Sequence, residues 1–258
     1  MNSPNEFSLW MRSNLKNSYS GLITQDIDFI ILNNKNQFLI VEEKLYQNAR
    51  TGPAQAIIYK MLYEILSVDP TFKGCFKISN VIENTGYLND EKKIIISDLI
   101  FNPDKYLNEF RNIWYEEVIT QYLPWLWDCK SPEIQKKTIK ENTFSRKSNL
   151  KKYLNKNKIK YESIDWIFVN YCSGNFIILN ESEEKTILKR ITNIFINHKK
   201  SEIPVRNPKS NSKYNFLGTY NITYEKDFSF FYINNKKVAK EDAIKVLNLD
   251  DENIVKYI

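Results

Sequence analysis

The chain has 258 residues, a formal net charge of +6 and a single histidine, His198. Its length suffices for one large domain or two small ones, and 42% hydrophobic with 14% aromatic residues excludes wholesale disorder. One histidine is too few for a zinc hydrolase with several histidine ligands or a ribonuclease with paired imidazoles. A Ser-His-Asp or Cys-His hydrolase would depend on His198, which lies in a polar run and is most simply a surface residue.

The cysteines and the N-terminus indicate the compartment. Cys75, Cys129 and Cys172 are far apart and odd in number, so free thiols in a reducing environment explain them better than disulfides or a zinc site. The N-terminus does not resemble an export signal, and no stretch reaches 18 uninterrupted apolar residues. We expect a cytoplasmic protein of a prokaryote or virus, without membrane attachment. A nucleotide cofactor is not expected, because the GxxxxGK[ST] motif is missing.

Hydrophobic periodicity and turn residues predict a mixed α/β (α+β) chain. A helix over 4–16 precedes two strands, 22–32 and 37–44, which form a hairpin around an Asn-rich turn. A helix then begins at Pro53 and ends at Leu66, since proline suits the first turn of a helix. The later elements predicted are strands 72–79 and 93–99, helix 104–121, strands 165–169 and 175–179, helix 183–197, a hairpin around 220–237 and helix 241–248.

Charged side chains interrupt the apolar hairpin. Asp28 lies inside the apolar run of the first strand, and the second strand ends with Glu42, Glu43 and Lys44. Side chains alternate between the faces of a strand, so Glu42 and Lys44 share a face while Glu43 points to the other. Closure of the hairpin brings Asp28 alongside them. Two carboxylates that converge in this way favour a bound divalent cation.

The helix that follows carries Gln55 and Tyr59, which are four residues apart and therefore share a face. With Asp28 and Glu42-x-Lys44, this Gln-x-x-x-Tyr helix resembles the PD-(D/E)xK nuclease superfamily, in the branch that has such a helix after the catalytic strands. The resemblance covers residues 6–63. It departs from the family motif at one position, because an isoleucine precedes Asp28 where the motif has its proline.

The resemblance implies a restriction-endonuclease-like core, in which helices flank a central mixed sheet, followed by a C-terminal α+β extension. We expect a nuclease domain over 1–130, a basic linker or helix over 131–160, and a C-terminal α+β region over 161–258 that binds DNA or dimerises. The implied activity is metal-dependent hydrolysis of DNA phosphodiester bonds that leaves 5′-phosphates. The expected cofactor is Mg²⁺, with Mn²⁺ as a substitute.

The same resemblance implies a ligand set for one or two metal ions. Asp28, Glu42 and the backbone carbonyl of Glu43 would hold the metal. Glu6 resembles an acid that some relatives contribute to this site, although an acid at a helix start also favours the helix dipole. Asp26 lies two residues before Asp28 on the same face, so it is a further candidate ligand and the alternative to Asp28 as the first one.

Three further side chains have implied catalytic roles. Lys44 would orient the attacking water or stabilise the charge that develops on the phosphorane, and Gln55 and Tyr59 would position the nucleophile or the adjacent phosphate. Other Glu-x-Lys triplets occur in the chain, but neither ends an apolar strand. Segment 164–168, followed by 176–180, imitates the first hairpin, yet Asn180 stands where the second carboxylate is needed. Only the first copy has all the parts.

Basic residues indicate a polyanionic partner. Between Lys136 and Lys160 there are ten Lys or Arg residues and one acid, a pattern that predicts either a DNA-binding segment or a solvated lysine-rich helix. One active site per chain cuts one strand, so double-strand cleavage predicts a homodimer. We expect a restriction-type endonuclease. The alternatives are a viral or repair nuclease of the same superfamily and a non-catalytic nucleic-acid-binding protein that keeps the fold. The candidate DNA contacts are Arg50, Arg146, Lys147, Lys151 and Lys152.

Overall fold

A computed structural model provides the structure of the chain. The residues it describes are 6–16, 21–49, 52–106, 148–171, 173–181, 186–198 and 214–249. Most of the predicted helix 104–121 lies outside these ranges, as do Cys129 and Cys172. Within the described residues, no helix is long and apolar enough to cross a membrane.

Among the described residues, the N-terminal part, 6–106, contains three helices, a 3-10 turn and five strands. The elements are α1 (Glu6–Asn14), β1 (Leu22–Leu32), β2 (Phe38–Lys44), α2 (Pro53–Leu66), β3 (Phe72–Ile82), β4 (Thr85–Leu88), β5 (Lys92–Ile95), α3 (Ile96–Phe101) and η2 (Pro103–Tyr106). The predicted hairpin 22–44 and the predicted helix 53–66 are confirmed.

The C-terminal part adds three helices and five strands among the described residues. They are α6 (Asn149–Lys156), β6 (Lys160–Asn170), β7 (Asn175–Asn180), α7 (Thr186–His198), β8 (Asn215–Tyr224), β9 (Phe230–Ile233), β10 (Lys236–Ala239) and α8 (Lys240–Asn248). The predicted hairpin around 220–237 is present as β8 and β9, and β10 extends it by one strand.

All the described strands belong to one mixed sheet, in the order β10-β9-β8-β7-β6-β1-β2-β3-β4-β5. Two neighbouring pairs, β2 with β3 and β7 with β8, are parallel, and the other pairs are antiparallel. The antiparallel pair β1–β6 lies at the centre and joins the two parts of the chain. The fold is therefore mixed α+β, with helices flanking a large mixed sheet, as predicted.

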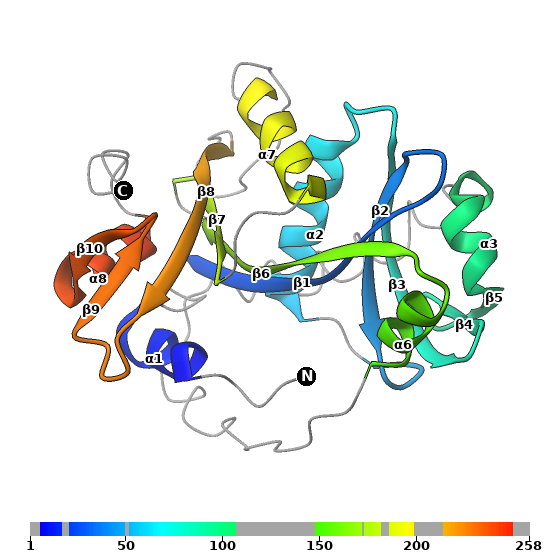
Figure 1. Cartoon of the computed structure of the whole chain (residues 1–258), viewed down its shortest axis with the longest axis horizontal. Coiled ribbons are helices and arrows are strands. Elements are labelled where there is room, and N and C mark those ends of the chain that lie inside the picture. Colours follow the sequence, from blue (N-terminus) through cyan, green and yellow to red (C-terminus); the bar gives the residue numbers. More distant parts are fainter. Residues whose placement is uncertain are drawn as a thin grey trace.

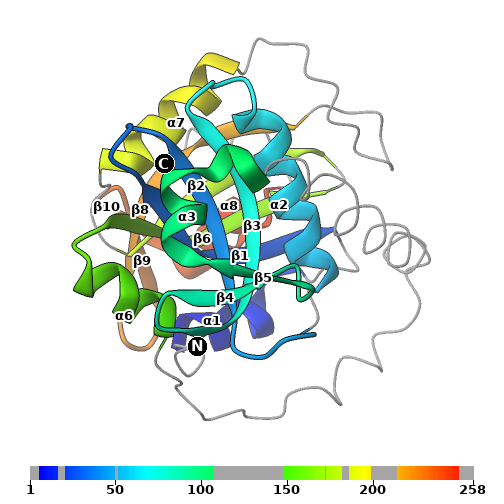
Figure 2. The ribbon, with the colours of Figure 1, turned by 90° about the vertical axis from the view of Figure 1, so that its right-hand side faces the viewer.

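Helices cover both faces of this sheet (Figure 1). α2 and α7 lie on one face and contact each other, whereas α1 and α6 lie on the opposite face. Figure 2, which looks from the β5 edge with α3 in front, has α7 toward the top of the view and α1 and α6 toward the bottom. Each helix buries an apolar face: Ile58 and Leu62 of α2 are fully buried against the N-terminal strands, and Phe7 of α1 is buried against β9. Such burial is the main source of helix stability in a folded chain.

One predicted strand, 93–99, is partly wrong. β5 ends at Ile95, and α3 begins at Ile96. The turn from strand to helix is fixed by Asn84, whose side-chain Oδ1 accepts the N–H of Ser97 at 2.9 Å and whose backbone carbonyl accepts the N–H of Ile96 at 2.8 Å. Three consecutive isoleucines favour a strand locally, so this tertiary contact overrides the local preference.

Candidate functional site

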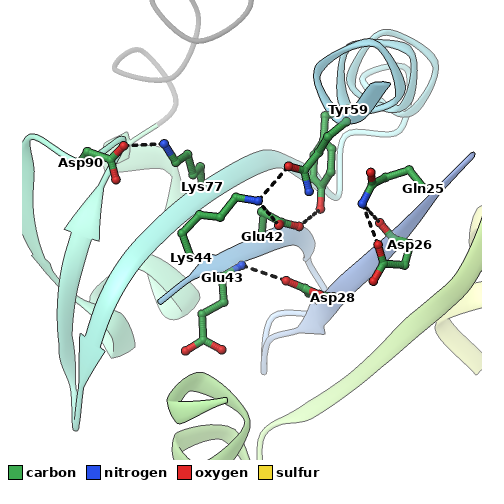
Figure 3. Close-up of polar contacts among 10 residues, drawn as sticks. Gln25, Asp26, Asp28, Glu42, Glu43, Lys44, Tyr59, Lys77 and Asp90 are labelled. Atoms are coloured by element: carbon green, nitrogen blue, oxygen red, sulfur yellow. Dashed lines mark hydrogen bonds and ion pairs between the residues drawn. The ribbon is translucent and has the colours of Figure 1, made fainter. Parts of the chain in front are cut away.

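The site lies where β1 and β2 separate (Figure 3). Their ladder ends at the pair Phe29–Val41, and beyond it the carboxylate of Asp28 takes the place of a strand partner. Asp28 Oδ2 accepts the backbone N–H of Glu43 at 3.2 Å. The side chain therefore satisfies a main-chain donor that the separated strand leaves unpaired. As predicted, Asp28 lies alongside the end of β2.

Helix α2 supplies the side chains of Tyr59 and Gln55, which form hydrogen bonds with Glu42 and Lys44 (Figure 3). Tyr59 Oη donates to Glu42 Oε2 at 2.8 Å, and Lys44 Nζ lies 2.8 Å from Glu42 Oε1. Lys44 Nζ also donates to Gln55 Oε1 at 2.9 Å. Glu42, Gln55 and Tyr59 are buried. The five residues predicted as catalytic are therefore adjacent in space, and four of them form one hydrogen-bonded network.

Burial and the charge of neighbouring acids raise the pKa values of Asp28 and Asp26. Burial raises the pKa of Asp28 to about 8, with further increases from the charges of Glu42 and Asp26. The pKa of Asp26 is raised by its low-dielectric surroundings and then by Glu42, although the residue itself reaches solvent. Gln25 Nε2 donates to Asp26 Oδ1 at 2.7 Å and orients it. Burial also raises the pKa of Tyr59 well above its usual value, so its hydroxyl keeps its proton.

A second charged pair lies one strand away and was not predicted. Lys77 of β3 stands beside Glu42 in the parallel ladder. Its ammonium forms a buried ion pair with Asp90, and Ser79 Oγ donates to the same carboxylate at 2.7 Å. The signal was present in the sequence, since Lys77 interrupts an apolar strand as Asp28 does, but the position of Asp90 in a turn gave no indication of the pairing.

The side chain of Glu43 has a separate structural role. It points to the other face of the sheet and accepts hydrogen bonds at the N-terminus of α6: from the backbone N–H groups of Asn149 at 3.2 Å and Leu150 at 3.0 Å, and from the hydroxyl of Ser148. A carboxylate at this position satisfies unpaired helix donors and complements the helix dipole. Only the backbone of Glu43 remains available to the site, as expected from the sequence.

The remaining predicted residues lie elsewhere. Glu6, on α1, lies with the C-terminal strands, where its charge contributes to the raised pKa of Tyr224, and α1 packs there through Phe7. Lys151 and Lys152 are exposed on α6. Within the segment expected to be a basic linker or helix, Asn149–Lys156 form a helix. Arg50, Arg146 and Lys147 lie outside the described residues.

The donor set suits a hard cation. Asp28, Asp26 and Glu42 offer oxygen ligands, and their mutual repulsion would be relieved by a positive ion. In the described part of the chain, no three His, Cys, Asp or Glu side chains are arranged as a ready metal-binding group.

Comparison with known proteins gives two relatives, both from Archaeoglobus fulgidus and both described as uncharacterized proteins. The first is 35% identical over 136 residues, which are 50% of this chain and 92% of the relative. The chain belongs to the family of this archaeal protein. The second relative is 31% identical over 144 residues, 47% of this chain and 93% of its own length. No protein-family model matches the chain, and no solved structure matches it.

Both family members therefore align over almost their whole length with about half of this chain. Each is little more than half as long as the chain. Their names assign no activity.

Proposed function

We propose that the chain is a metal-dependent endonuclease with a restriction-endonuclease-like core, which hydrolyses DNA phosphodiester bonds to leave 5′-phosphates. The observation that supports this most directly is the convergence of Asp28, Glu42 and Lys44 where two strands separate. An acid pair beside a lysine is costly in an ordinary fold. It is useful where a cation and a phosphate have to be bound together.

Mg²⁺, or Mn²⁺ in its place, would be held by Asp28, Glu42 and the backbone carbonyl of Glu43, with Asp26 as a further oxygen donor. When bound, such an ion polarises a phosphate and lowers the pKa of a coordinated water. Asp28 has a raised pKa, so at neutral pH it must release its proton as the cation binds.

Lys44 provides the positive charge that phosphate chemistry requires. An ammonium has three donors, and among the described residues two of them are directed at Glu42 and Gln55. The third is left for a water or a phosphate oxygen. Gln55 and Glu42 fix the position of the ammonium from two sides, so little reorganisation is needed when negative charge develops on the phosphate.

Tyr59 keeps Glu42 in place. Its hydroxyl occupies Glu42 Oε2, so the carboxylate cannot rotate without losing a buried hydrogen bond, and Lys44 holds the other oxygen. Tyr59 therefore acts as a positioning residue, and the acids and the lysine would contact the metal, the water or the phosphate.

The test is an incubation of the purified chain with supercoiled, linear and single-stranded DNA, in Mg²⁺, in Mn²⁺ and in EDTA. Cleavage is expected with either metal and none with EDTA. Asp28→Asn and Lys44→Met should each lower the rate by a factor on the order of 100 or more. Cleavage that survives both substitutions would refute this site, and failure to cleave any substrate would favour a binding protein that keeps the fold.

Asp165→Asn is the matched control. Asp165 of β6 accepts the backbone N–H of Glu181 at 2.9 Å, which is the contact that Asp28 makes with Glu43. Asp165 has Asn180, rather than a glutamate, as its neighbour. The same chemical change at Asp165 should leave cleavage intact, which would separate loss of a ligand from general damage to a strand end.

A further inference from the structure

The described elements run through the same order twice. Residues 6–106 form helix, hairpin, helix, parallel strand, hairpin and helix, and residues 148–249 repeat that order. The sheet order is palindromic about β1 and β6. In Figure 1, β3–β5 with α3 stand at one end of the molecule, opposite β8–β10 with α8 at the other.

The repeat extends to the residue level in the central strands. The last hairpin pair before the strands separate is Phe29–Val41 in the first part and Trp166–Leu179 in the second. The residue just before Phe29 in β1 and the residue just before Trp166 in β6 are both aspartates, Asp28 and Asp165. Each aspartate accepts a backbone N–H from the partner strand. Two unrelated halves would not be expected to share this irregularity.

The parallel pairs share a second irregularity. The β2–β3 register shifts after Phe38–Phe72, and the β7–β8 register shifts after Phe176–Phe216. At each shift lies a glycine with positive φ, Gly74 at 108° and Gly218 at 146°. A Cβ atom at Gly218 would lie 2.5 Å from the hydroxyl of Tyr220, so glycine is needed there.

The outer hairpins match as well. Leu88 pairs with Lys92, and Ile233 pairs with Lys236. Each turn begins with two left-handed residues, Asn89 and Asp90 in the first part and Asn234 and Asn235 in the second, with φ between 48° and 68°. The backbone bond from Asn89 N–H to the Lys77 carbonyl, at 3.1 Å, recurs from Asn234 to Asn221 at 2.9 Å.

The centre of the sheet has the geometry of a two-fold axis. When Asp28 is superposed in sequence on Asp165, Ile27 corresponds to Ile164, and these two residues pair with each other across β1 and β6. A residue that pairs with its own counterpart marks a two-fold axis, as in an isologous dimer. The two aspartates lie on either side of this axis.

The N-terminal helices cross to the opposite part, as in an exchanged dimer. α1 precedes β1, yet its Trp10 packs on Phe228 and Phe231 of the second part. α6 precedes β6, yet its N-terminus is bound by Glu43, and Asn149 Nδ2 donates to the carbonyl of Val81 in β3. The second part thus contributes the helix that holds the Glu43 side chain, next to the candidate site.

The second copy keeps the aspartate, Asp165, but has asparagine at three charged positions of the first. The position of Glu42 is held by Asn180, that of Lys77 by Asn221 and that of Asp90 by Asn235, as the strand registers define them. Helix α7 contains neither a glutamine nor a tyrosine to replace those of α2. Asn180 is buried, and its Nδ2 has no hydrogen-bond partner among the described residues. Because a buried polar group without a partner destabilises a fold, stability alone does not explain an asparagine at this position.

We infer that the chain is a covalent pseudodimer: the part over 148–249 is a second copy of the fold over 6–106 and takes the place of a partner subunit. One polypeptide then holds one chemically complete centre and one silent centre. Each family member, little more than half as long as the chain, aligns with about half of it. This pseudodimer replaces the homodimer expected from the sequence. Its consequence for the reaction, one cut strand per bound duplex, rests on the proposed function.

The assembly is tested first, and this test does not depend on catalysis. Sedimentation equilibrium of the full chain, alone and with a short blunt duplex, should give the mass of one chain, 30.7 kDa, and at most one chain per duplex. The Asp28→Asn chain is used with DNA so that cleavage cannot alter the result. A stable species of twice the chain mass would overturn the pseudodimer, whether or not DNA is cut.

The reaction is tested second, on supercoiled plasmid with the chain in excess over DNA. Open circles should accumulate first, and linear DNA should appear only later, from independent cuts. Linear DNA formed at the same rate as the first nick would overturn the single-centre assignment. No cutting of any substrate would refute the proposed function, while the measured mass would still decide between pseudodimer and homodimer.

Discussion

Tyr59 donates a hydrogen bond of 2.8 Å to Glu42, and both side chains are buried where α2 packs on the end of β2. The two oxygens of this carboxylate have different partners, a neutral phenol on one side and the ammonium of Lys44 on the other. Because the pKa of Tyr59 is raised well above its usual value, the phenol remains a donor at every pH at which the chain would work.

Replacing Tyr59 by phenylalanine should destabilise the fold by about 1 to 3 kcal/mol, because a buried carboxylate oxygen loses its donor. Urea unfolding at neutral pH measures this free energy. Tyr161→Phe is the matched control: its hydroxyl donates to Asn155 Oδ1 at 3.2 Å near the surface, so its loss should cost under about 0.5 kcal/mol. Equal losses in the two variants would argue against a special role for the buried phenol.

Lys77 and Asp90 should show strong coupling in unfolding free energy. Lys77→Asn alone leaves a largely buried carboxylate without its ammonium, at a cost of about 3 to 5 kcal/mol. The double variant Lys77→Asn, Asp90→Asn copies the residues found at Asn221 and Asn235. It should lose less than the sum of the two single variants, by about 1 to 3 kcal/mol. Additive losses in this double-mutant cycle would contradict the coupling between Lys77 and Asp90.

Glu43→Gln should destabilise the chain by about 1 kcal/mol, because it removes the charge that complements the N-terminus of α6 while keeping an acceptor. Thermal unfolding at low ionic strength gives the clearest measurement, since salt screens this interaction. Glu64→Gln is the control, because Glu64 forms only a 3.8 Å pair with Lys60 on the helix surface. If Glu43→Gln proved as neutral as the control, the capping role would be refuted.

Asp28→Asn should stabilise the chain at alkaline pH and change little near pH 4. The pKa of Asp28 is raised to about 8 in the folded chain, whereas the usual value of 3.8 applies to the unfolded chain. Between these two pH values the folded chain keeps a proton on Asp28 that the unfolded chain has lost. The contribution of Asp28 to the free energy of unfolding is therefore fully present below the pKa of the unfolded state. It is lost as the pH rises through the pKa of the folded state. The variant avoids this loss, so at pH 9 its melting temperature should exceed that of the wild type by several degrees.

Asp98→Asn should change the pH dependence of stability in the opposite direction. Hydrogen bonds from Lys105, Asn102 and Tyr106 lower the pKa of this half-buried carboxyl to about 2. Its contribution is present above the unfolded pKa and is lost only as the pH falls through the folded one. Asp98→Asn should therefore lower the melting temperature at pH 7, and the difference should shrink toward pH 2. A melting curve of each variant across pH separates the two cases.

The sequence predicted the parts of the site that are close together in the chain. The hairpin and α2 follow from strand periodicity, an Asn-rich turn and a proline at a helix start, and they bring Asp28, Lys44 and Gln55 to one place. The bond from α6 to Glu43 joins residues more than a hundred positions apart. No local pattern encodes such a contact, and the same holds for Asn84 at the start of α3.

The repeat was visible in the sequence as a second hairpin that resembles the first and carries Asn180 in place of the acid. The pairing of Ile27 with Ile164 shows that the two copies are related by a two-fold axis, and this contact is not visible in the sequence. Apolar strands of similar composition pair in several registers with similar energy, so sequence alone does not select this one.

The central pairing of β1 with β6 also determines what the chain exposes while it is being made. β1 is complete long before β6 leaves the ribosome, since Leu22 pairs with Asn170. In that interval β1 is an open sheet edge with apolar residues such as Ile23 and Ile30 and no partner on one side, which is the kind of surface that joins other chains. Two nascent chains could satisfy each other's β1 in place of β6. Production of this protein should therefore depend on nascent-chain concentration and benefit from slow expression or chaperones.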